Sequence, residues 1–110
     1  MKYRREKFTS VIQEAAGKYI SEKSFDNAMI TVTSVIVSKD LSRATVCISV
    51  IPEEKEEDIN KKLNKGKGLF AKFIKANTRI FKIPYFSFKI DEGEKHRQKI
   101  DRISIKKNSL

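Results

Sequence analysis

Apolar side chains recur every three or four positions near the start of the chain. The positions that share this spacing are Phe8, Val11, Ile12, Ala15, Ala16, Tyr19 and Ile20. On an α-helix such positions lie on one face, because neighbouring turns bring residues three and four apart together. The pattern therefore predicts an amphipathic helix over residues 2–21, with one face available for a core.

Two stretches rich in β-branched residues follow and predict strands at residues 28–38 and 44–51. In the second stretch two sets of side chains alternate, namely Ala44, Val46, Ile48 and Val50 against Thr45, Cys47 and Ser49. Such alternation is typical of a sheet with one buried face. Residues 39–42 form a short link without glycine, so we expect the two strands to make an antiparallel hairpin.

Pro52 ends the second strand, because it has no N–H to donate to a sheet. The acidic residues 53–58 come next and precede Ile59 and Leu63, which are four positions apart. Carboxylates are favoured in the first turn of a helix by its dipole. We interpret the acidic cluster as the beginning of a short helix and not as a pair of catalytic acids.

Helical spacing resumes after residues 66–68 and continues to Ile80. The apolar positions are Leu69, Phe70, Phe73, Ile74 and Ile80, while the opposite side carries Lys72, Lys75 and Arg79. This helix is predicted to have one apolar and one wholly basic face. Pro84 ends it, and residues 85–90 alternate as a third strand with Tyr85 facing outward and Phe86 and Phe88 facing the core.

The predicted order is helix, strand, strand, helix, helix, strand. A helical segment between the second and third strands allows a mixed three-stranded sheet with helices on one face, which is an α+β fold. We expect one domain over residues 1–92 and a short polar tail at residues 93–110. Ile100, Ile103 and Ile105 would pack part of that tail on the domain.

The charge of the chain is strongly positive and unevenly placed. The 110 residues hold 24 Lys and Arg against 14 Asp and Glu, a formal net charge of +10. Residues 61–90 contain nine of these cations and no acid. A solvated helix face normally mixes both signs, so this stretch favours a site for a polyanion such as a nucleic acid.

The candidate RNA-binding residues are Lys2, Arg4, Arg5, Lys65, Lys67, Lys72, Lys75, Arg79 and Lys82. Most of the cations of the chain are lysines, which act as mobile point charges and not as bidentate readers of bases. We therefore expect recognition of RNA backbone and shape. Tyr85 is the outward aromatic that could contact a base.

The sequence offers little for catalysis or metal binding. One cysteine and one histidine exclude a disulfide within the chain and any multi-cysteine metal site. Cys47 is expected to be a small, buried or half-buried strand residue, and His96 a surface residue. We expect no catalytic residue, metal or cofactor, and thus no enzyme.

No apolar run approaches the roughly 18 residues of a membrane span. The basic start of the chain is followed by core-like residues from Phe8 onward, so no targeting leader is expected. These features predict a cytoplasmic monomer without a membrane partner.

Several stretches together resemble bacterial ribosome-binding factor A, a small-subunit assembly factor. They are Arg4 and Arg5 in the first helix, residues 30–35, residues 37–44, Gly68, and residues 83–91. The resemblance implies a KH-like fold of the second topological type. It also implies binding to small-subunit ribosomal RNA during late maturation and rRNA processing, with importance at low temperature. The alternative is a structural basic nucleic-acid-binding protein such as a ribosomal protein.

The helix break at Gly66 and Gly68 is the last candidate feature. The family usually has Ala-x-Gly here, so only the second glycine matches. The chain has no Gly-x-x-Gly loop, in agreement with the family and against the usual KH contact with single strands. We expect both glycines to reach positive φ and to orient the basic face, so that Gly68→Val would displace its lysines.

Overall fold

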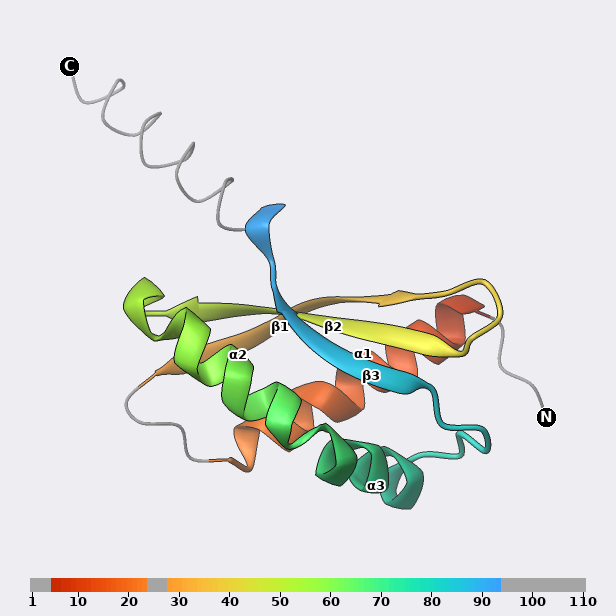
Figure 1. Cartoon of the computed structure of the whole chain (residues 1–110). Helices are drawn as coiled ribbons and strands as arrows, with labels where there is room; N and C mark the ends of the chain where they lie inside the picture. The colour runs from red at the N-terminus through yellow and green to blue at the C-terminus, as the bar shows by residue number, and fades with distance from the viewer. Residues whose placement is uncertain (1–4, 24–27, 94–110) are drawn as a thin grey trace.

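The computed structural model describes residues 5–23 and 28–93 (Figure 1). Its elements follow the predicted order and are α1 (Arg5–Ser21), β1 (Met29–Val37), β2 (Arg43–Ile51), a 3-10 turn at Glu53–Lys55, α2 (Glu56–Lys65), α3 (Lys67–Asn77) and β3 (Tyr85–Ile90). The three helices lie on one face of a three-stranded sheet (Figure 1). The α+β fold is confirmed. Lys2, Arg4, and all of the expected tail except Gly93 lie outside the described residues.

The sheet has the order β1-β2-β3 and is mixed, as predicted. β1 runs antiparallel to β2, and β3 runs parallel to it. The parallel pair is possible because α2 and α3 carry the chain from one end of β2 back to the start of β3. The even-numbered residues of β2, from Ala44 to Val50, are buried beneath the helices, as the alternation predicts. Cys47 of the opposite set is buried as well, in agreement with its expected place in a strand.

A β-bulge in β1 corrects the phase of its apolar residues. Ile30 and Val32 face the helices, but so do Val35 and Val37, which are out of step with them by one position. The register shifts between Val32 and Ser34, leaving Thr33 as the extra residue. Without this extra residue Val35 and Val37 would face away from the helices, because successive strand residues point to opposite faces.

Aromatic rings form the centre of the core. The ring centroid of Phe70, a fully buried residue of α3, lies 5.0 Å from that of Tyr19, 4.7 Å from that of Phe86 and 5.1 Å from that of Phe88. All three contacts are edge-to-face, the arrangement that ring quadrupoles prefer. The predicted core role is confirmed for Phe70, Phe86 and Phe88, while Phe73 is only half-buried.

The helix predicted from Leu69 to Ile80 is shorter in the structure. α3 ends at Asn77, because Thr78 adopts an extended conformation with φ −135° and ψ 171°. The Thr78 hydroxyl donates to the Ile74 carbonyl at 2.6 Å and accepts the Ile80 N–H at 3.2 Å, which fixes the turn out of the helix. Ile80 belongs to the loop that follows α3 and reaches the core from there, and Arg79 also lies outside the helix. Leu69, assigned to the apolar face, is 59% exposed.

Candidate nucleic-acid interface

A row of cations follows α3 from end to end. We call it the basic strip, and its members are Lys65, Lys67, Lys72, Lys75, Arg79 and Lys82. It starts at the last residue of α2, continues along the 11-residue α3 and ends in the loop of residues 78–84. An 11-residue helix is about 16 Å long, so the strip is long enough for several phosphates. Five of the six side chains are exposed, and Lys67 is half-buried.

The lysines of α2 differ from those of the strip because carboxylates neutralise them. Lys61 Nζ lies 3.5 Å from Glu57 and Lys62 Nζ lies 3.1 Å from Asp58, both pairs spanning one helical turn. The acidic residues occupy the 3-10 turn and the first turn of α2, as predicted. Within the described ranges, no cation of the strip has a carboxylate partner. The uncompensated charge is therefore concentrated on α3 and its loop.

Lys67 is held against Tyr85 of β3. Its ammonium lies 4.3 Å from the centroid of the Tyr85 ring and also hydrogen-bonds the phenolic oxygen. Tyr85 is 62% exposed, so its predicted outward orientation is confirmed. Lys67 covers the ring, and a base stacking there would have to share the ring with this lysine.

Arg5 has a structural contact that the sequence did not indicate. Its Nη2 donates to the Val37 carbonyl at 2.7 Å and ties the start of α1 to the end of β1. The start of α1 lies at the same end of the molecule as the loop after α3 (Figure 1). Of the three N-terminal candidates only Arg5 is described, and it is exposed.

The helix break does not work as the sequence suggested. No glycine among the described residues has a positive φ, so that expectation is wrong. Gly66 lies between the helices with φ −92° and ψ 15°, and its carbonyl accepts the Phe70 N–H at 3.1 Å to begin α3. Gly68 is an exposed residue within α3, and a Cβ added to it would meet nothing within 4 Å. No close contact would then push the strip lysines aside in Gly68→Val.

Asn64 fixes the end of α2 to the edge of the sheet. Its Nδ2 donates to the Phe88 carbonyl at 3.0 Å, and its Oδ1 accepts the Phe88 N–H at 2.8 Å. The side-chain amide thus satisfies both backbone groups of Phe88, at the open edge of β3. This pair of hydrogen bonds ties the last turn of α2, next to Lys65 of the strip, to β3. Sequence reasoning missed it, because a single asparagine on a helix carries no signal of its partner.

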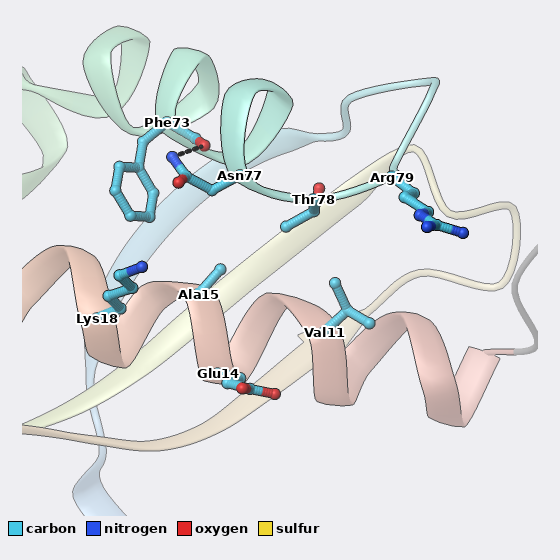
Figure 2. Close-up of a pocket in the computed structure, with 8 residues that line it drawn as sticks. All are labelled: Val11, Glu14, Ala15, Lys18, Phe73, Asn77, Thr78 and Arg79. Atoms are coloured by element: carbon cyan, nitrogen blue, oxygen red, sulfur yellow. Dashed lines mark hydrogen bonds between the residues drawn. The ribbon is translucent and has the colours of Figure 1, made fainter.

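A groove of about 360 Å³ lies between α1 and the end of α3 (Figure 2). Val11 and Ala15 of α1 and Phe73 of α3 give it apolar walls, and Lys18 and Arg79 lie at its rim. Figure 2 shows the Glu14 side chain on the part of α1 that is farther from α3. Asn77 Nδ2 donates to the Phe73 carbonyl at 2.9 Å, which leaves its Oδ1 available to a ligand. The groove is continuous with the strip through Arg79.

The turn between β1 and β2 is fixed by one carboxylate. Hydrogen bonds from the hydroxyls of Ser42 and Ser38, and then from the Ser42 N–H, lower the pKa of Asp40 to about 2. Leu41 beside it adopts a left-handed conformation with φ 61°, the position at which a turn more often has glycine.

The described residues provide neither a cluster of metal ligands nor a helix that could span a membrane. No group of three or more potential metal ligands was found in residues 5–23 and 28–93. In the same ranges no helix combines the length and the apolar character needed to cross a bilayer.

Comparisons with known proteins place the chain among ribosome-binding factors. The family model described as Ribosome-binding factor A matches residues 4–104. A ribosome-binding factor A from Lactobacillus acidophilus is 36% identical over 76 residues, which are 67% of this chain and 63% of the relative. The chain thus matches somewhat less than two thirds of that relative's length. The crystal structure of ribosome-binding factor A from Thermus thermophilus has a TM-score of 0.72 at 19% identity and covers 79% of this chain and 94% of that one.

Proposed function

Since this chain belongs to the ribosome-binding factor A family, we propose that it is a non-enzymatic ribosome assembly factor that binds small-subunit ribosomal RNA. It binds free, immature small subunits through the basic strip, and it acts during late maturation, when the rRNA is processed. Its action is in the cytoplasm as a monomer, with the greatest importance at low temperature. Family membership supports the parts about maturation, processing and temperature.

One observation supports the RNA-binding part most directly, namely the separation of charge between α2 and α3. Glu57 and Asp58 pair with Lys61 and Lys62 of α2, whereas the strip cations have no carboxylate partner among the described residues. A protein that needed its lysines only for solubility would gain by mixing the signs. An uncompensated row of lysines is suited to phosphates, whose bound counterions are released when the protein binds.

The test compares two double variants that remove the same charge. Lys72→Gln/Lys75→Gln removes two strip cations, and Lys61→Gln/Lys62→Gln removes two cations of α2. For binding to purified small subunits, we expect the strip variant to lower the slope of log affinity against log salt by roughly 1.5, since each phosphate contact contributes about 0.7–0.9. The α2 variant should change the slope much less. Equal slopes for both variants would mean that net charge alone drives binding.

A sucrose-gradient profile separates an assembly factor from a permanent ribosomal protein. The proposal expects the tagged chain with free or immature small subunits and little of it in translating ribosomes. Stoichiometric presence in translating ribosomes would instead identify a structural ribosomal protein. A second experiment uses cells that lack the protein. The proposal expects these cells to accumulate immature small subunits, most of all during growth at low temperature.

A further inference from the structure

Phe81 is the most exposed large apolar side chain of the described residues. It is 99% exposed, while the others of this kind range from 54% to 65%. Burying a phenylalanine normally stabilises a protein, and the free chain forgoes that contribution at Phe81. Sequence reasoning did not single it out, because Phe81 lies between the helical spacing that ends at Ile80 and the strand pattern that begins at Tyr85.

The local structure holds Phe81 outward. On its N-terminal side, Ile80 is buried and its N–H is bound by the Thr78 hydroxyl at 3.2 Å. On its C-terminal side, Pro84 is buried and Ile83 is half-buried. Only Phe81 and Lys82 remain outside between these two anchors. The ring is thus presented to solvent by a loop that is anchored at both ends.

The neighbours of Phe81 decide what kind of partner suits the ring. Arg79 and Lys82 are both exposed, and no acid occurs in residues 61–90. An apolar protein surface gains nothing from these cations, whereas a nucleic acid offers phosphates to the cations and a flat apolar face to the ring. Paired RNA hides its base faces, so the partner would be an unpaired base. The groove beside Arg79 adds a further apolar surface next to the loop (Figure 2).

We infer that Phe81 stacks on an unpaired base of the bound RNA, while Arg79 and Lys82 contact the phosphates on either side of that base. This inference rests on the proposed function and adds one specific contact to it. The basic strip would follow the backbone of paired RNA, and the loop would mark the place where the RNA is single-stranded.

The absence of tryptophan from the sequence permits a direct test. Phe81→Trp places a single indole at the loop, and Ile36→Trp places one at a 61% exposed position of β1, outside the strip. Each variant is titrated with an RNA hairpin that has an unpaired loop and with a fully paired duplex. We expect the hairpin to quench the fluorescence of Phe81→Trp much more than the duplex does. Neither RNA should quench Ile36→Trp appreciably.

Affinity measurements distinguish the effect of the aromatic ring at position 81 from that of an apolar side chain in general. Phe81→Leu keeps an apolar side chain but removes the ring, and should weaken hairpin binding by roughly five- to hundredfold, the loss expected for one base stack. It should leave the salt slope unchanged, because no charge is removed. Phe81→Tyr should restore most of the affinity. Lys82→Gln should instead lower the salt slope by about 0.7–0.9.

The outcomes distinguish this inference from the proposed function. If the wild-type chain binds neither the hairpin nor small subunits, the proposed function is wrong. If the wild-type chain binds and Phe81→Leu binds equally well, only the stacking contact is wrong. Fluorescence of Phe81→Trp that responds to anionic lipid vesicles but not to the hairpin would overturn the inference in favour of a membrane contact.

Discussion

Replacing Gly68 with alanine should stabilise the protein. Gly68 is the second residue of α3, it is exposed, and its φ is not positive. An added Cβ would meet nothing within 4 Å. The only remaining effect is on conformational freedom, since glycine has more of it to lose on folding than alanine.

The expected gain follows from helix propensity. Glycine in a helix interior costs about 0.8–1.0 kcal/mol relative to alanine, and compatible Gly→Ala changes stabilise proteins by about 0.4–1 kcal/mol. Because Gly68 lies in the first turn, we expect the lower half of that range. For a domain of this size the melting temperature should rise by roughly 2–4 °C.

Urea unfolding followed by circular dichroism measures the change, with two other glycines as references. Gly17→Ala, in the middle of α1 and also without a contact within 4 Å, should stabilise the protein more. Gly66→Ala should be close to neutral, because its Cβ would lie 3.5 Å from the Lys62 carbonyl oxygen at an accessible φ and ψ. A loss of stability in Gly68→Ala would show that this residue needs a positive φ in solution and that the helix break lies at Gly68.

Three other changes test the remaining contacts. Asn64→Ala should cost about 1–3 kcal/mol in urea unfolding, because it leaves the Phe88 N–H and carbonyl without a partner. Asn64→Asp should also destabilise the protein, because it places a carboxylate oxygen against the Phe88 carbonyl; unchanged stability in both variants would refute the amide pairing. Phe70→Ala should cost about 3–5 kcal/mol, since Phe70 is fully buried; a loss below about 1 kcal/mol would contradict its central place in the core. The folded pKa of Asp40 is lowered to about 2 from an ordinary 3.8, so its stabilising contribution is complete above the ordinary value and lost as the pH falls through about 2. An NMR titration of the carboxyl group, with Asp40→Asn as the control, would refute this if the midpoint lay near 3.8.

Side-chain periodicity predicted the fold because each element has only one apolar face. The alternation in β2 and the spacing in α1 leave no other face to bury, and the structure agrees with both. The bulge at Thr33 was missed because it is visible only once β1 is aligned with β2. It could have been found from the change of phase between Val32 and Val35, which are three positions apart and would face opposite sides of a regular strand.

The end of α3 was missed for a different reason. Ile80 continues a helical spacing perfectly well, and no proline or glycine follows until Pro84. The helix nevertheless ends after Asn77, because the Thr78 hydroxyl replaces the next helical hydrogen bonds. Side chains of this type compete locally with the helix backbone, and their choice depends on the packing that follows. Ile80 reaches the core from the loop, and Arg79 and Phe81 are thereby turned into the solvent.

Three features that oppose stability lie on α3 or in the loop that follows it. α3 begins with Lys67 and has neither an acid in its first turn nor a side-chain cap, although cations at that end of a helix are unfavourable by about 0.3–1 kcal/mol. Gly68 weakens the same turn, and Phe81 leaves its ring in water. By contrast, the charges of α2 match the helix dipole, with acids in its first turn and basic residues in its last, although α2 also lacks a side-chain cap. Proteins tend to break such rules at functional sites. A cation and a glycine in the first turn of α3, together with the exposed Phe81 in the loop that follows it, contrast with the acids in the first turn of α2. This contrast supports the proposed RNA contact on this side of the molecule independently of the number of lysines.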